Sequence, residues 1–255
     1  MYGVAVFAAI ATMSFVTTFK GSAFADAPQT VKDKATRPMR KEFTPPVADP
    51  ALPNVLLIGD SISIAYTLGV REQLAGRANV YRPPINCGPT TRGVTMIDRW
   101  LGDTRWDVIH FNFGLHDLKY MGPDGSNLAD PDNANSAVQV PIDAYRRNLD
   151  QIVRRLNQTD ATIIWRPTTP VPKGARGRVP GDAAKYNRVA LEVMRQYPNV
   201  QTDPFDNHAA SIASLQKSAD VHYTPQGARA QAEHVARVIA EALKPSVPPK
   251  SETNR

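Results

Sequence analysis

Ser61 stands where a nucleophile is well placed on an α/β sheet. Residues 55–58 form a short apolar run, which is typical of a fully covered parallel strand. Gly59 then lets the chain turn sharply, and Asp60 and Ser61 lead into a helical pattern over residues 62–75. Ligands of open α/β sheets bind beyond the carboxyl ends of the strands, and helix N-termini favour developing negative charge. The alternative is that Asp60 or Ser61 only caps the helix.

His222 is the best candidate for a general base that activates Ser61. A nucleophilic serine needs a base, a group that orients the base, and donors for an oxyanion. His222 lies in a loop directly ahead of a helix that Thr224-Pro225 opens. Asp220 is suited to orient the imidazole, although aspartates near helix starts often serve only as caps.

Three other histidines fit the role of the base less well. His110 falls inside an expected strand, where a packing role is favoured. His234 falls in the middle of an expected helix between polar neighbours, and we expect it to be a solvated surface residue. His208 follows Asp206-Asn207 in a loop, and its role stays open.

Donors for an oxyanion are expected at the ends of the first three strands. The first is the backbone amide of Ser61. The second is Gly88, which follows the second strand and lets the backbone approach a ligand closely, although Gly88-Pro89 also fits a plain turn. The third is a side chain of the Gly114-Leu115-His116-Asp117 segment after the third strand, which also fits a turn with a capping aspartate.

Alternating strand and helix patterns predict the fold that must position these residues. Strands are expected at residues 54–60, 79–83, 106–113, 161–165 and 199–202. Helices are expected at residues 62–75, 94–101, 142–156, 183–197, 209–216 and 225–243. This alternation predicts a three-layer α/β/α sandwich around a mainly parallel five-stranded sheet. Long loops at residues 115–140 and 169–181 follow the third and fourth strands, on the side where Ser61 should lie.

Four motifs in this order resemble the SGNH, or GDSL-type, esterase superfamily. They are Gly59-Asp60-Ser61, the loop with Gly88, the glycine and aspartate after the third strand, and the late Asp/His pair before the last helix. The resemblance covers about residues 53–243 and implies a flavodoxin-like fold. It also implies that Ser61 is the nucleophile, that His222 is the base, and that Gly88 and the Ser61 amide are oxyanion donors. No Gly-x-Ser-x-Gly elbow of the α/β-hydrolases carries the serine.

The chain departs from the superfamily pattern at two positions. His116 stands where the family usually has asparagine. A neutral imidazole N–H still donates to an oxyanion, whereas a protonated one would bind it more strongly and depend on pH. The usual final aspartate lies three residues before the histidine, where this chain has Ala219, and Asp220 lies only two before His222. Either Asp220 completes a triad or a Ser–His dyad operates.

Composition and charge bound the setting in which such a site would work. Residues 1–25 resemble a secretory signal with Ala23-Phe24-Ala25 as the cleavage pattern. We therefore expect a periplasmic or secreted protein without a stable membrane span after cleavage. A proline-rich arm is expected at residues 26–53, the hydrolase domain at 54–244 and a disordered tail at 245–255. The single Cys87 excludes an internal disulfide, so the core must supply the stability.

The expected activity is hydrolysis of short acyl esters, with a small ester or an acylated carbohydrate as substrate. Arg92, Asp60 and Asp117 are predicted to contact it. The expected loops carry several cations that suit polar or anionic sugars: Arg92, Lys119, Lys173, Arg176 and Arg178. The formal net charge is +6, but no nucleic-acid motif accompanies it, and nucleic acid is not an expected partner. No metal-binding or cofactor-binding motif is found, so neither a metal nor a cofactor is expected.

Two other functions stay open at this point. One is an O-acyltransferase of the same fold acting on cell-envelope glycan, because only the fate of the acyl-enzyme differs. The other is a non-catalytic glycan-binding module, in which His116 and Ala219 mark a lost site. The oligomeric state is not predicted.

Overall fold

The protein is built on one parallel sheet, which a computed structural model describes within residues 39–244. The strand order is β2-β1-β3-β6-β7. The strands are β1 (Asn54–Ile58), β2 (Asn79–Tyr81), β3 (Val108–Phe111), β6 (Thr162–Trp165) and β7 (Val200–Thr202). This confirms the predicted five-stranded parallel sheet. The predicted signal segment and tail lie outside the described residues.

The strand register brings the carboxyl ends of the inner strands to one edge. Ile58 pairs with Phe111, and Phe111 pairs with Trp165. The residues that follow these three strands therefore emerge at the same level of the sheet. The chain order also reverses direction between β1 and β3, and such a switch point is the usual ligand site of an open α/β sheet.

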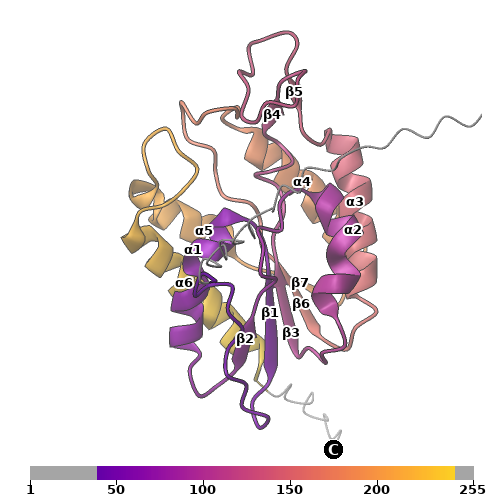
Figure 1. The fold of residues 1–255 in the computed structure, drawn as a ribbon, viewed down its shortest axis with the longest axis vertical. Helices are drawn as coiled ribbons and strands as arrows, with labels where there is room; N and C mark the ends of the chain where they lie inside the picture. The colour runs from indigo at the N-terminus through magenta and orange to yellow at the C-terminus, as the bar shows by residue number, and fades with distance from the viewer. Residues whose placement is uncertain (1–38, 245–255) are drawn as a thin grey trace, which may run out of the picture. The chain divides into compact units, whose positions relative to one another are not determined.

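Helices cover both faces of the sheet, as expected for a three-layer sandwich. They are α1 (Ser61–Gln73), α2 (Thr90–Leu101), α3 (Ile142–Leu156), α4 (Asp182–Met194), α5 (Phe205–Ser211) and α6 (Pro225–Ala242). Figure 1 shows α1 and α6 on one side of the sheet and α2 and α3 on the other. Contacts between α1 and α6, between α2 and α3, and between α3 and α4 hold each layer together.

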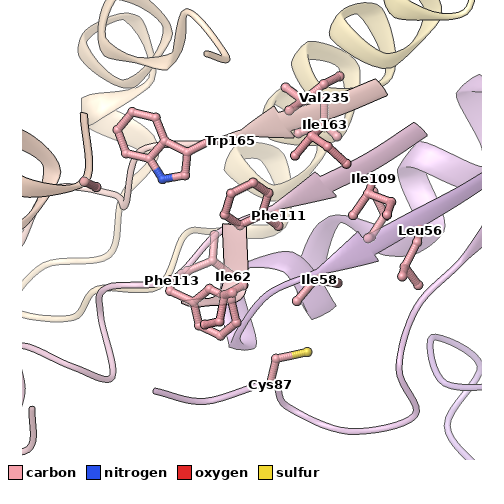
Figure 2. Close-up of a cluster of buried hydrophobic side chains, with 14 of the residues drawn as sticks. Leu56, Ile58, Ile62, Cys87, Ile109, Phe111, Phe113, Ile163, Trp165 and Val235 are labelled. Carbon is pink, nitrogen blue, oxygen red and sulfur yellow. The ribbon is translucent and has the colours of Figure 1, made fainter. Parts of the chain in front are cut away.

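The core lies between these layers and explains why the strands are apolar. Leu56, Ile109 and Ile163 lie side by side on neighbouring strands and are at most 2% exposed. Figure 2 shows this row of strand side chains, with Val235 of α6 close to it. The continuous apolar run of β1 follows from burial on both faces, because alternating polar residues would have no solvent to face.

Three local features differ from the sequence prediction. The long loop at residues 115–140 contains a short antiparallel pair, β4 (Tyr120–Met121) with β5 (Ala137–Val138). Two-residue strands are too short to show a period of two in the sequence. Helix α2 begins at Thr90 and not at Val94, and α5 begins at Phe205, directly after Pro204, earlier than predicted.

The described part of the arm, residues 39–53, lies against the start of the sheet. The Asn79 side chain accepts a hydrogen bond from the Asp49 backbone N–H at 2.9 Å and donates to the carbonyls of Asp49 and Leu52. These bonds hold the arm to β2. None of the helices within residues 39–244 is both long and apolar enough to cross a membrane.

Candidate active site

Ser61 is the first residue of α1 and is held at the edge of the sheet by the turn that follows β1. The Asp60 side chain caps the helix by accepting from the Ile62 backbone N–H at 2.9 Å. A Cβ on Gly59 would lie 2.8 Å from Ser63 Oγ, so the turn leaves room only for glycine. Ser61 is half-buried, and its backbone N–H meets no acceptor within the described part of the chain. Both its hydroxyl and its amide are therefore available to a ligand.

His222 and Asp220 meet Ser61 from the loop ahead of α6. Ser61 Oγ lies 2.8 Å from His222 Nε2, and His222 Nδ1 lies 2.7 Å from Asp220 Oδ1. Burial raises the pKa of Asp220, but hydrogen bonds from the side chain and backbone of His222 outweigh it and leave that pKa lowered. An ionised carboxylate only accepts hydrogen bonds, so Nδ1 carries the imidazole proton and Nε2 faces the hydroxyl as an acceptor.

The spacing of two residues between Asp220 and His222 is what makes this contact possible here. Asp220 Oδ1 also accepts from the His222 backbone N–H at 3.1 Å, as in an Asx turn, so one oxygen binds both nitrogens of the same residue. Ala219 takes the left-handed conformation with φ 53°, which turns the chain into this geometry. The Ser61, His222 and Asp220 side chains are thus within hydrogen-bond distance of one another in the order that a triad requires.

The glycine after β2 is less free than the sequence indicates. Gly88 adopts φ 66°, but its backbone N–H already donates to Asn86 Oδ1 at 2.9 Å. An oxyanion would have to compete with that acceptor. Asn86 Nδ2 donates to no atom of residues 39–244, so Asn86 keeps an unused donor next to Gly88, which makes it a candidate that the sequence analysis missed. The sequence pattern that could have identified it is an asparagine two residues before Gly88, which is the spacing of an Asx turn.

His116 follows β3, is half-buried and makes no hydrogen bond with the described residues. Burial lowers its pKa to about 4, because desolvation disfavours the charged ring and the nearby cations outweigh the charge of Asp60. The imidazole is therefore neutral at pH 7. The sequence left open whether His116 would act as an oxyanion donor in its neutral or its protonated form, and the lowered pKa favours the neutral form.

Two of the three residues predicted to contact the substrate lie beneath the site. Asp60 is 2% exposed and caps α1, and Asp117 is fully buried. Asp117 Oδ1 accepts from the Thr90 backbone N–H at 2.9 Å and from Thr90 Oγ1 at 2.5 Å. Asp117 therefore caps α2, because the residue at the N-cap position, Pro89, makes no side-chain hydrogen bond to the helix. Both carboxylates support the loops and do not reach a ligand. Arg92 is exposed and stays a candidate for substrate binding.

The remaining histidines gather around a different carboxylate. His110 is fully buried with Nε2 3.2 Å from Asp203 Oδ2, which confirms its place in the core. The prediction for His234 is wrong, because it is 3% exposed and its Nε2 lies 2.5 Å from Asp203 Oδ1. The polar neighbours of His234 in the sequence indicated an exposed position, but His234 lies on the face of α6 that packs inward. His208 stacks on His234 with ring centroids 4.3 Å apart.

A separate cavity of about 890 Å³ opens beside β6, α4 and α5. Trp165, Leu191 and Phe205 are among the residues that line it, and neither Ser61 nor His222 is. The reactive hydroxyl thus lies outside this apolar cavity. Residues 39–244 hold no group of three or more histidine, cysteine or acidic side chains arranged to bind a metal ion.

The fold is that of an α/β protein with a serine, a histidine and an aspartate in hydrogen-bond contact at the carboxyl edge of its parallel sheet. The chain belongs to the GDSL-like lipase/acylhydrolase family, whose model matches residues 57–230. This confirms the resemblance found in the sequence. The family places the chain among acyl hydrolases. No curated protein shows significant similarity to it.

Solved structures of this superfamily share the fold at low sequence identity. A lipase/acylhydrolase from Enterococcus faecalis is 17% identical, with a TM-score of 0.59 over 76% of this chain and 99% of that one. An acetylxylan esterase from Geobacillus stearothermophilus is 16% identical, with a TM-score of 0.55 over 73% of this chain and 94% of that one. A second acetyl xylan esterase is 13% identical, with a TM-score of 0.57 over 73% and 99%.

Asp117 makes the stability of the protein depend on pH in a specific direction. Burial raises its pKa to about 7, and Oδ2 meets no partner within the described residues. The folded state therefore binds a proton that the unfolded chain, with an ordinary carboxyl, releases above about pH 4. This contribution to the free energy of unfolding falls as pH rises from about 4 to about 7.

Comparison with Asp117→Asn isolates this effect, because the amide accepts from Thr90 in the same way but does not titrate. Urea denaturation of both proteins between pH 4 and 8 gives the measurement. We expect the wild type to lose stability relative to the variant as pH rises through that window. Parallel stability curves would contradict the raised pKa of Asp117.

Proposed function

We propose that this protein is an esterase that hydrolyses short-chain, acetyl-type carboxylic esters through a serine acyl-enzyme. The observation that carries the proposal is the hydrogen-bonded chain from Ser61 Oγ through His222 to Asp220 Oδ1, with distances of 2.8 and 2.7 Å. These contacts match the roles of nucleophile, base and orienting carboxylate. They favour a catalytic role over that of a glycan-binding module, which has no need of them.

In this mechanism His222 Nε2 takes the proton of Ser61 as Oγ attacks the acyl carbonyl. The Ser61 N–H and the neutral His116 ring donate to the oxyanion, together with Asn86 Nδ2 or the Gly88 N–H. His222 then returns the proton to the leaving alcohol. Water, activated by the same imidazole, attacks the acyl-enzyme and releases the acid. Asp220 stabilises the imidazolium in both steps.

A short acyl group on a carbohydrate is the substrate we favour. Two of the structural neighbours are acetylxylan esterases, which supports an acetyl ester on a sugar. The apolar cavity of about 890 Å³ does not include Ser61, so it offers no acyl tunnel that begins at the nucleophile. An acyltransferase would use the same residues and differ only in passing the acyl group to a sugar hydroxyl.

Substitution of the catalytic residues tests the proposed mechanism with p-nitrophenyl acetate. We expect Ser61→Ala and His222→Ala each to lower kcat by about 10³-fold or more, because residues that act as one unit lose most of their effect together. Asp220→Asn should lower kcat by a comparable factor if the triad operates, and only slightly if a dyad does. Ser211→Ala, a change at an exposed serine of α5, is the matched control.

Turnover of long-chain but not acetyl esters would refute the proposed substrate class. Product analysis with an added sugar acceptor separates hydrolysis from transfer. Free acetate as the main product supports the esterase, and an acetylated acceptor supports the transferase.

His116 offers a second test, which concerns the oxyanion. His116→Ala should lower kcat by about 10²- to 10³-fold, the usual loss for one oxyanion donor. His116→Asn should restore most of that loss, since a neutral amide donates as a neutral imidazole does. The pKa of His116 is about 4, so its titration should add no break to the pH profile of kcat above about pH 5. Equal activity of the alanine variant and the wild type would remove His116 from the mechanism.

We also propose that the protein is exported and cleaved after Ala25. The support is the apolar segment and the Ala23-Phe24-Ala25 pattern, which precede the described residues. Mass spectrometry of the protein recovered from the periplasm or medium should find Asp26 at its N-terminus. Recovery of the intact chain from the cytoplasm would contradict export.

A further inference from the structure

Three cations from separate elements converge on His116 at the candidate active site. Arg92 comes from α2, Lys119 follows β3, and Arg178 belongs to the loop after β6. After burial, which is the largest influence, the charges of all three lower the pKa of His116. Burial lowers the pKa of Arg178 as well, while the charges of Asp60 and Asp220 oppose that effect. The cluster therefore lies close to the residues that flank Ser61 and His222.

The two arginine side chains are held in place by contacts with the backbone. Arg178 Nε donates to the Leu115 carbonyl at 3.0 Å, and an Arg92 terminal nitrogen donates to the Asn86 carbonyl at 3.0 Å. The Tyr120 N–H donates to the Gly177 carbonyl at 2.8 Å, which joins the loop that carries Lys119 to the loop that carries Arg178. The two guanidinium groups and the loop that carries Lys119 are therefore positioned before any ligand arrives.

None of the three cations has a carboxylate within 4.0 Å among residues 39–244. The nearby carboxylates are already engaged. Asp60 caps α1, Asp117 accepts from Thr90, and Asp220 binds His222. The cluster thus keeps a positive charge that the protein itself does not neutralise.

Lys119 is the most telling member of this cluster. The residue is 8% exposed, and its ammonium nitrogen, which keeps some contact with solvent, makes no hydrogen bond within the part of the chain that the structure describes. Burial lowers its pKa, and the charges of Arg178 and Arg92 lower it further. Buried charges are ordinarily paired or hydrogen-bonded, because desolvation without a partner is costly.

Arg82 shows the ordinary arrangement in the same protein. It is 6% exposed, and its guanidinium donates to five oxygens, among them Ser63 Oγ and Thr67 Oγ1. The fold itself therefore satisfies the donors of Arg82. Lys119 has no such partners among the described residues, and its ammonium group keeps contact with solvent, so it is open to a group from outside the chain.

We propose that Lys119, Arg178 and Arg92 form an anion subsite beside Ser61 that binds a carboxylate of the ester substrate. This inference rests on the proposed esterase function and narrows its substrate class. The carboxylate can belong to the alcohol part, as in an acetylated acidic sugar, or to the acyl part, as in the half-ester of a dicarboxylic acid. Arginine binds a carboxylate in a planar, bidentate way, and lysine adds a point charge.

Matched ester pairs that differ only in charge distinguish the two sources. 4-Acetoxybenzoate and 4-acetoxybenzamide place the charge on the leaving group. 4-Nitrophenyl hydrogen succinate and 4-nitrophenyl butyrate place it on the acyl group, with the spontaneous hydrolysis subtracted. For one of the pairs we expect the wild type to prefer the carboxylate ester in kcat/KM, and the preference should fall as ionic strength rises.

Substitution of the cluster should remove this preference. Lys119→Met keeps the buried stem and deletes the charge, and Arg92→Gln changes an exposed residue, so its fold is secure. In each variant the ratio of kcat/KM for the carboxylate ester to that for the neutral ester should fall by about 10- to 100-fold, the usual effect of a charged hydrogen bond. Arg99→Gln and Arg147→Gln, changes at exposed cations of α2 and α3 that have no predicted contact with the substrate, should leave the ratio unchanged.

A binding measurement separates failure of this inference from failure of the esterase proposal. Calorimetry with Ser61→Ala compares 4-hydroxybenzoate with 4-hydroxybenzamide, and succinamate with butyramide, without any turnover. We expect one of the carboxylates to bind more tightly than its neutral counterpart, and this difference should disappear when Lys119→Met is added to Ser61→Ala. That result supports the subsite even if no ester is hydrolysed. Hydrolysis of neutral esters with no preference for either carboxylate ester, and no change of the ratio in Lys119→Met, overturns the subsite and leaves the esterase standing.

Discussion

The position of β1 in the interior of the sheet is the constraint on which the site depends. This strand is hydrogen-bonded to β2 on one side and to β3 on the other, and Val55 to Ile58 are at most 2% exposed. The carboxyl end of β1 therefore has little freedom to move. Ser61 is held equally firmly, because the short Gly59 turn connects it directly to this strand. The register of β1 with β3 also fixes how far Ser61 stands from the residues that follow β3. As the proposed nucleophile, Ser61 needs no reorganisation of the sheet when a substrate arrives.

The loop before α6 shows how a departure from the family pattern is accommodated. With the aspartate only two residues before His222, its carboxylate is close enough to accept from both the backbone and the ring of the histidine. The left-handed conformation of Ala219 is part of this solution, and a residue other than glycine there carries some strain. The Lys217 N–H donates to the His222 carbonyl at 2.9 Å and closes the loop. The local backbone geometry thus lets the Asp220 carboxylate reach the imidazole, although Asp220 lies one residue closer to His222 in the chain than in the family pattern.

Charge and burial divide the polar residues of this protein into two groups. Asp60, Asp117 and Arg82 are buried and hydrogen-bonded, and they shape the loops. Ser61, His116 and Lys119 retain hydrogen-bonding capacity that the described chain leaves unused. The second group is the one that we propose the substrate meets, because an unused donor beside Ser61 offers binding energy that the fold does not need.

The sequence by itself determined the order of the strands and helices, the five-stranded parallel sheet and the triad candidates Ser61, His222 and Asp220. Hydrophobic periodicity and the residues at strand ends carry that information locally. Only the tertiary structure decided that His234 is buried, that Asp117 caps α2, and that Lys119 has no hydrogen-bond partner among the described residues. These facts depend on contacts between residues distant in the chain, and no local pattern records which polar group finds a partner once the layers pack.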